Sequence, residues 1–396
     1  MSRTPLLDGL KIVDFSALLP GPYGTVLLAD LGADVIKVEP PTGDMLRHLP
    51  FDMVRVANRN KRSLVLDLKN AASREVVDRL AAWADIVVEG SRPGVAERMG
   101  IGPERLRAMH PKLVYCSISG FGQTGPWRLR AGHDISYLAA SGALAYPGSA
   151  NDSRPRRSGL PVSDLAGSLY FAVAALAAWA RAQKTGVGAT LDLSLTEAAM
   201  SFASVRGDLN RADPNLNYLM PGNDTFATAD GRWMALGLIE PMFWDHFVAA
   251  AADVEPRLRS PAYATLAQRL GCVAEVSAVI AAAMRQRDAA AWMALFEHHD
   301  VPAHTVLSPA EASATEQAVA RGLLCEIDGE RHLPFPVQVD GEPGGSLRTL
   351  APALGADTAE VLGTLGFDAH GIARLLASGA CDAREPREPR AGTGPT

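Results

Sequence analysis

Short apolar segments rich in β-branched residues alternate with segments of helical pattern through the first third of the chain. A helix between two such segments carries the chain back over one face of a sheet, so that the next strand runs parallel to the last. The sequence therefore predicts an α/β fold whose parallel sheet has helices on both faces. The predicted strands are 10–15, 34–39, 63–68, 85–89 and 113–119.

A chain of 396 residues is longer than the chains that usually fold around a single hydrophobic core, so we expect two domains. Residues 1–205 are predicted to form the large parallel-sheet domain, and the polar stretch 206–223 a linker. A smaller α/β domain is predicted over 224–330, beginning with a hairpin around Asp230-Gly231. Residues 331–380 are expected to return to the large domain, and 381–396 to form a disordered tail.

Composition and motifs exclude several classes of function. A formal net charge of −6, without a run of Lys and Arg, argues against a nucleic-acid partner. The turn after the first predicted strand reads G-P-Y-G instead of G-x-G-x-x-G, and no phosphate-loop lysine motif is present. We therefore expect neither a nicotinamide or flavin cofactor nor nucleotide hydrolysis.

Cysteine usage and hydropathy indicate a cytoplasmic protein. Cys116, Cys272, Cys325 and Cys381 have no spacing typical of a metal site and are expected to be reduced. The first residues lack the apolar stretch of a secretory signal. The longest apolar run, Leu169–Ala180, is too short to span a bilayer and is expected to be a buried helix, so no membrane partner is predicted.

His133 and Asp164 each stand at the start of an apolar segment with many small residues. A helix that begins at such a point buries its body and holds the polar residue rigidly at a cleft, where burial can tune its pKa. The alternative is that both are ordinary helix-start residues, since Asp is favoured at the positive end of the helix dipole. Each position, taken alone, leaves both interpretations open.

Five basic residues follow or precede predicted strands: Lys37, Arg59, Lys61, Arg62 and Arg92. At the ends of parallel strands they would form a rim suited to a phosphate-bearing ligand, because Arg and Lys pair readily with phosphate. A solvated basic face is the alternative, and spacing alone favours it.

Motifs along nearly the whole chain point to one family. They are L-x-G-L-K-I-V-D-F, A-D-L-G-A-D-V-I-K-V-E, N-R-N-K-R-S-L-V-L-D-L-K, S-I-S-G-F-G-Q-T-G-P, P-V-S-D-L-A-G and A-P-A-L-G. Together they resemble the family III CoA-transferases (CaiB/BaiF), a superfamily that also contains α-methylacyl-CoA racemase. The resemblance implies a Rossmann-like large domain with a smaller domain late in the chain, and two interlocked subunits. It also implies an acyl-CoA substrate, with no cofactor beyond that CoA.

The segments G-H-D-I and G-L-I-E-P-M-F resemble the racemase branch in particular. This resemblance implies His133 and Asp164 as two opposed bases and Glu240 as the hydrogen-bond partner of the histidine. It further implies that the backbone N–H of Asp134 stabilises an enolate. Lys37, Lys61, Arg62 and Arg92 resemble positions that bind the phosphates and adenosine of CoA, and Arg59 is counted with them.

The leading hypothesis is an epimerase that inverts the carbon α to a CoA thioester by two-base proton transfer. The second hypothesis is a CoA-transferase that moves CoA between carboxylic acids, with Asp164 as the nucleophile that forms an acyl anhydride. The third is an acyl-CoA-binding protein without catalytic activity.

Overall fold

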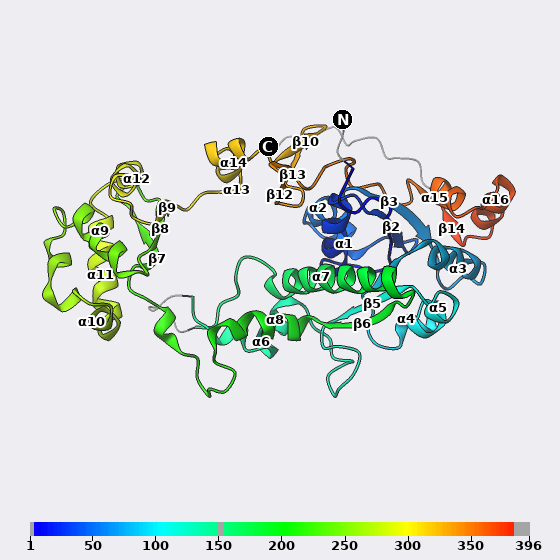
Figure 1. Cartoon of the computed structure of the whole chain (residues 1–396), viewed down its shortest axis with the longest axis horizontal. Helices are drawn as coiled ribbons and strands as arrows, with labels where there is room; N and C mark the ends of the chain where they lie inside the picture. The colour runs from blue at the N-terminus through cyan, green and yellow to red at the C-terminus, as the bar shows by residue number, and fades with distance from the viewer. Residues whose placement is uncertain (1–3, 149–153, 384–396) are drawn as a thin grey trace. The chain divides into compact units, whose positions relative to one another are not determined.

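The structure is a computed structural model that describes residues 4–148 and 154–383 (Figure 1). The chain divides into two compact units. The first comprises residues 1–143, 158–203 and 316–396, and the second comprises residues 144–157 and 204–315.

A seven-stranded sheet forms the centre of the first unit, in the order β14-β3-β2-β1-β4-β5-β6. Strands β1 to β6 are mutually parallel, and only the short β14 runs antiparallel, beside β3. The predicted parallel sheet is thus confirmed. Its strands are β1 (Lys11–Asp14), β2 (Asp34–Glu39), β3 (Lys61–Leu66), β4 (Ile86–Glu89), β5 (Val114–Ser119), β6 (Ala189–Ser194) and β14 (Cys381–Asp382).

The strand order reverses between β1 and β4, because the chain builds outward from β1 to β3 and then returns to place β4 on the other side of β1. In open α/β sheets, such a reversal leaves a crevice beyond the carboxyl ends of the two strands, where ligands bind. This edge is therefore the first place to look for a functional site.

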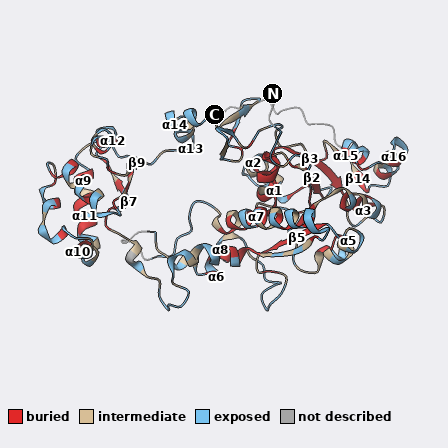
Figure 2. Ribbon diagram, in the orientation of Figure 1, coloured by how far each residue is buried: buried red, intermediate tan, exposed pale blue. Residues whose placement is uncertain are grey.

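Helices cover both faces of the sheet, and strands β1 to β5 are almost wholly buried between them, whereas most of the edge strand β6 is not (Figure 2). Val13, Ile36 and Leu64 pack on the face covered by α3 (Ser73–Trp83), α5 (Pro103–Met109), α15 (Thr358–Thr364) and α16 (Ala369–Ala377). Ile12 and Val35 pack on the opposite face against α1 (Pro20–Asp30), α6 (Asp134–Ala140) and α7 (Val162–Thr185).

The remaining elements of this unit are short. They are η1 (Met45–His48), α2 (Met53–Asn58), α4 (Val95–Arg98), α8 (Leu195–Ala203) and α14 (Glu316–Arg321), with the strand pairs β10 (Cys325–Ile327) and β11 (Glu330–His332), and β12 (Gln338–Val339) and β13 (Glu342–Pro343).

Helix α7 contains the apolar run expected to be a buried helix. In the described part of the chain it is the one helix long and apolar enough to cross a membrane. One side of it packs on α1 and on β5 and β6, but Leu169, Tyr170 and Val173 on its other side are exposed. The expectation of a buried helix is therefore only partly met. The close approach of α7 to α1 depends on Gly24, because a Cβ there would lie 2.5 Å from a ring carbon of Phe171.

The second unit has its own sheet and core. Strands β7 (Asn223–Ala227), β8 (Trp233–Gly237) and β9 (Ala303–Thr305) form an antiparallel sheet, with the expected hairpin turn at Gly231, whose φ is 77°. Trp292 stacks on Phe296 at 5.1 Å between ring centroids in the centre of its core. Its helices are α9 (Pro241–Ala251), α10 (Leu266–Gly271), α11 (Val273–Met284), α12 (Ala289–His298) and α13 (Pro309–Ser313).

The unit boundaries differ from the predicted ones. Residues 144–157 and the whole of the expected linker, 206–223, belong to the second unit, where Tyr146 packs on Tyr218 and donates a hydrogen bond to Asp208. The second unit ends at residue 315 instead of 330. The expected tail begins too early, since Cys381 is buried and pairs with Leu66; its remainder, 384–396, lies outside the described residues.

A buried group of charges ties the first three strands together. The Asp14 carboxylate accepts hydrogen bonds from Lys61 Nζ at 3.1 Å and from Thr25 Oγ1 at 2.7 Å, and Lys37 Nζ lies 3.9 Å away. Burial alone would raise the pKa of Asp14, but the charges of Lys37 and Lys61 and the hydroxyl hydrogen bonds of Ser16 and Thr25 together outweigh it and lower this pKa to about 2. Burial lowers the pKa of Lys61 to about 8, against the opposing effect of Asp14.

The substitution Lys61→Ala is expected to destabilise the protein by about 3–5 kcal/mol, because it leaves a buried carboxylate short of a partner. Urea-induced unfolding measures the change. The exposed Lys69→Ala is the matched control, with an expected effect within about 0.5 kcal/mol. Equal effects of the two substitutions would contradict this role of Lys61.

Candidate active site

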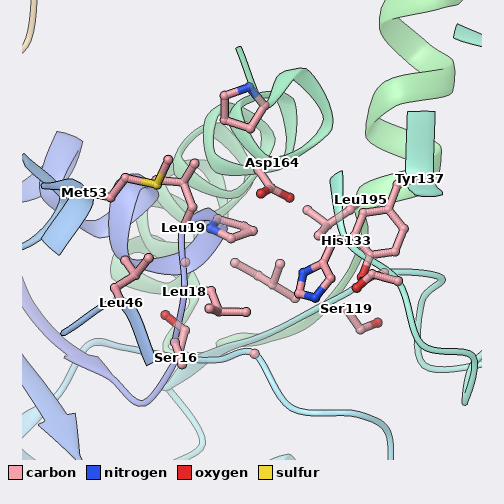
Figure 3. A pocket seen from close by; sticks show the side chains of 18 of the residues that line it. Ser16, Leu18, Leu19, Leu46, Met53, Ser119, His133, Tyr137, Asp164 and Leu195 are labelled. Atoms are coloured by element: carbon pink, nitrogen blue, oxygen red, sulfur yellow. The ribbon is translucent and has the colours of Figure 1, made fainter. Parts of the chain in front are cut away.

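A cavity of about 240 Å³ lies at the carboxyl edge of the sheet, where the strand order reverses (Figure 3). Its walls come from the loops that follow β1, β4 and β5 and from the starts of α1, α6 and α7. The residues that line it are Ser16, Ala17, Leu18, Leu19, Pro20, Gly21, Leu46, Leu49, Phe51, Met53, Gly90, Ile118, Ser119, Gly120, Gly132, His133, Tyr137, Pro161, Asp164 and Leu195.

His133 and Asp164 come from two helix starts and both point into this cavity (Figure 3). His133 is the residue immediately before α6, and its backbone N–H lies 3.5 Å from Ser136 Oγ. Asp164 is in the first turn of α7. The structure thus brings together the two polar residues that the sequence left 31 positions apart.

The Asp134 carboxylate closes the start of α7. Its Oδ1 accepts hydrogen bonds from the backbone N–H of Ser163 at 2.8 Å, from Ser163 Oγ at 2.7 Å and from the backbone N–H of Asp164 at 3.4 Å. Helix starts leave their first N–H groups without partners inside the helix, and a carboxylate satisfies them well. A residue of α6 therefore caps α7 beside Asp164.

Burial and the neighbouring negative charge of Asp134 raise the pKa of Asp164 from 3.8 to about 7. A carboxyl group with this pKa exists in both protonation states near neutral pH, so it can give up a proton or accept one. An imidazole faces the same space. The arrangement is therefore suited to acid–base chemistry with two partners.

The wall of the cavity beside α1 and η1 is apolar, formed by Leu18, Leu19, Leu46 and Met53 (Figure 3). Among the described residues that line the cavity, the ionisable side chains are those of His133, Asp164 and Tyr137. None of these lining residues is Lys or Arg. Tyr137 donates its hydroxyl hydrogen to the carbonyl of Gly132 at 2.6 Å and is thereby occupied. The ring of Tyr137 also fills the space beside Gly120, where a Cβ would lie 2.3 Å from it.

Ser119 was not singled out from the sequence. It is the last residue of β5, lines the cavity, and has a buried Oγ without a hydrogen-bond partner in the described protein. Buried hydroxyls are rarely left unpaired, so this group is available to a ligand. The signal that could have revealed it is its place at the end of a predicted parallel strand.

The predicted basic rim is not assembled at one edge. Lys37 and Lys61 are buried with Asp14, and Arg59 is buried in a two-point pair with Asp30 at 2.6 and 3.0 Å. Lys37 also donates to the backbone carbonyl of Ser16. The side chains of Lys37, Arg59 and Lys61 therefore bind groups of the protein itself and do not form the predicted rim for a phosphate. Each of these residues lies in a strand or just before one.

The other two predicted basic residues lie at opposite edges. Arg62 is the second residue of β3, so it sits at the amino edge, where it pairs with Asp34 at 2.7 Å. Arg92 follows β4 at the carboxyl edge and is exposed, and its charge acts on Tyr137 of the cavity. Of the five, Arg92 is the exposed one on the side of the sheet where the cavity opens.

A second cavity of about 250 Å³ also lies beyond the carboxyl ends of β3 and β4, and the sequence analysis did not identify it. Lys69, Arg74 and Arg98 line it, all three exposed. Three cations around one cavity favour a phosphorylated ligand.

Glu240 belongs to the second unit, where it is exposed and precedes α9. Its predicted hydrogen bond to His133 stays a prediction, as do the catalytic roles of the residues in the first unit.

Comparison with known proteins supplies the wider context. A model described as CoA-transferase family III matches residues 7–358. Alpha-methylacyl-CoA racemase from Homo sapiens is 30% identical over 379 residues, which cover 93% of this chain and 96% of that protein. Acetyl-CoA:oxalate CoA-transferase from Acetobacter aceti is 31% identical over 370 residues, covering 88% and 92%. The crystal structure of a CaiB/BaiF family protein from Brucella suis has a TM-score of 0.82 at 27% identity, covering 92% of this chain and 100% of that one.

The substitution Asp164→Asn is expected to raise the melting temperature, by an amount that grows from about pH 4 to about pH 7 and is constant above. The reason is that the folded-state pKa of Asp164 lies above its unfolded value of 3.8, at about 7. The stability linked to the protonated carboxyl is present below the lower value and lost as the pH rises through the upper one. Thermal unfolding across this range, with the exposed Asp8→Asn as control, measures the effect; a gain independent of pH would refute it.

Proposed function

The chain belongs to CoA-transferase family III, and we propose that it is an acyl-CoA racemase that inverts the carbon α to a CoA thioester. The observation that carries this proposal is the cavity shared by His133 and an Asp164 whose pKa is raised to about 7. Inversion needs one group to remove a proton from one face of the carbon and another to return a proton to the opposite face. These two side chains can do so only if their protonation states are opposite and exchange with the direction of reaction.

In one direction, neutral His133 removes the α-proton and protonated Asp164 supplies a proton to the other face. In the reverse direction, ionised Asp164 removes the proton and the imidazolium supplies one. A pKa of about 7 keeps both forms of Asp164 accessible near neutral pH. Burial is the larger cause of that pKa, which makes the apolar wall part of the chemistry.

The intermediate is an enolate, whose negative oxygen needs a donor placed in advance. The backbone N–H of Asp134 opens α6 and has no acceptor among the described residues, so it is free for this role. The thioester matters because a free carboxylate already bears a charge, which makes its α-proton far harder to remove.

The apolar wall and the absence of Lys or Arg among the described lining residues favour an acyl group without a second charge. A 2-methylacyl or 2-arylpropionyl group meets this condition. A thioester of a dicarboxylic acid keeps one free carboxylate, which would need a cationic or N–H partner in the cavity.

The cavity of Lys69, Arg74 and Arg98 fits the phosphates of CoA. It lies beyond β3 and β4 at the same edge of the sheet as the acyl cavity, so one extended ligand could use both. Arg92 follows β4 as well and would contribute to the same anchor.

The second candidate is a CoA-transferase with Asp164 as nucleophile, favoured by the similarity to the Acetobacter aceti transferase. A nucleophilic carboxylate must be ionised. The raised pKa of Asp164 leaves a large protonated fraction near neutral pH, which suits a proton donor better than a nucleophile.

Incubation of (R)-2-methylacyl-CoA in deuterated water is expected to incorporate deuterium at the α-carbon and to produce the S epimer, because the returned proton comes from exchanged side chains. The substitution His133→Ala should reduce the rate by about 10²–10⁴-fold. Mass spectrometry and chiral analysis measure both. CoA exchange onto a free acid, with no α-deuterium across several chain lengths, would refute the racemase and support the transferase.

The substitution Arg74→Ala is expected to raise the KM for an acyl-CoA about tenfold, because it removes one exposed charge-assisted hydrogen bond to a phosphate of CoA. The KM for the matching acyl-pantetheine, which lacks the nucleotide, should not change. Arg62→Ala, at the amino edge, is the matched control with no expected effect on either substrate. Equal increases for both substrates would rule out a phosphate contact.

A further inference from the structure

One acidic side chain in the first unit has two effects on Asp164. The Asp134 carboxylate accepts the hydrogen bonds from the backbone N–H groups of Ser163 and Asp164 and so fixes the first turn of α7. It also brings a second negative charge next to the Asp164 carboxyl. A cap alone does not call for a charge, because Ser and Asn are equally common caps and carry none.

We propose that the Asp134 side chain is a positioning residue of the reaction, which fixes Asp164 at the cavity by capping α7 and places a negative charge beside the first turn that carries Asp164. This inference rests on the proposed racemase function and assigns the side chain a role separate from the backbone N–H of the same residue. This role explains why the charged side chain of Asp134 is tolerated next to His133, one of the two candidate bases.

The geometry favours a direct effect. Ser163 donates to Asp134 Oδ1 through both its backbone N–H and its hydroxyl, so the carboxylate is held firmly in place. Ser163 itself is fully buried, and Asp164 is half-buried at the cavity. Oδ1 of Asp134 lies 3.4 Å from the backbone nitrogen of Asp164, and a negative charge this near favours the protonated form of the Asp164 carboxyl.

Other ionisable groups surround Asp164, but Asp134 is the charge that acts on its pKa, after burial. His133 and Tyr137 share the cavity with Asp164. The groups on elements packed against α7 are Tyr23 and Asp30 on α1, Glu197 on α8, Tyr115 and Cys116 on β5, and Asp192 on β6; Arg92 lies beyond β4. Asp30 is neutralised by Arg59, and Glu197 and Asp192 line a different cavity.

The test separates the charge from the cap with three variants. Asp134→Asn keeps an oxygen acceptor for the start of α7 and removes the charge. Ser163→Ala keeps the charge and removes one of its hydrogen-bond donors. Asp134→Ala removes the charge and the cap together, and all three retain the backbone N–H of residue 134. The measured quantities are kcat/KM for 2-methylacyl-CoA epimerisation across pH and the melting temperature across pH.

In Asp134→Asn, the alkaline limb of the pH profile, measured in the direction in which protonated Asp164 supplies the proton, should move to lower pH by about one unit, so that kcat/KM on that limb falls about tenfold relative to its maximum. Ser163→Ala should lower kcat/KM without moving the limbs. An unchanged profile in Asp134→Asn, or an equal shift in Ser163→Ala, would overturn the proposal, since a merely structural cap predicts those results.

A second measurement needs no activity and so keeps failure of the inference distinct from failure of the proposed function. The gain in melting temperature that Asp164→Asn produces above neutral pH should become smaller when it is combined with Asp134→Asn, because one carboxylate no longer repels the other. Fully additive effects would overturn the inference even if the enzyme proves to be a racemase. Absence of α-deuterium exchange with a clear non-additive effect would overturn the racemase and leave the charge coupling in place.

Discussion

The structure of the first unit depends on one buried carboxylate, Asp14, held between Lys37 and Lys61 at the end of the central strand. These contacts join β1, β2 and β3 and fix the loop that follows β1, because Lys37 also donates to the carbonyl of Ser16. Asp44 pairs with Lys37 and accepts the backbone N–H of Leu18, whose φ of 63° costs about 1–3 kcal/mol for such a side chain. A loop that lines the cavity is thus held in a strained conformation by charges buried beneath it.

The cavity combines two properties that usually oppose each other. Its apolar wall and buried position make an ionised carboxylate unfavourable, yet two carboxyl groups, Asp134 and Asp164, lie at its edge. The Asp134 carboxylate is satisfied by the hydrogen bonds that cap α7, and burial together with the charge of Asp134 raises the pKa of Asp164. A stability penalty at Asp164 is what gives its carboxyl a pKa useful for proton transfer, the kind of trade-off expected at a functional site.

The pattern of the chain was enough to predict strands β1 to β5, the helices on both faces and the edge at which a ligand site would form, but not β14, which lies where a disordered tail was expected. It was also enough to select His133 and Asp164. It failed for the basic residues, because a cation beside a strand can turn inward to a carboxylate such as Asp14 or Asp30 as readily as outward. It also missed Ser119 and the cavity of Arg74 and Arg98, which depend on loops from separate strands meeting in space.

The sequence by itself determined the α/β class, since alternation of strand and helix with short turns admits few other arrangements, and its motifs identified the family that the comparisons then established. Only the tertiary structure decided which polar residues act on one another. The strand reversal between β1 and β4 opens the cavity, and the packing of α6 on α7 brings Asp134 against Asp164 from 30 positions away. A pKa depends on burial and on charges near in space, and neither can be read from order along the chain.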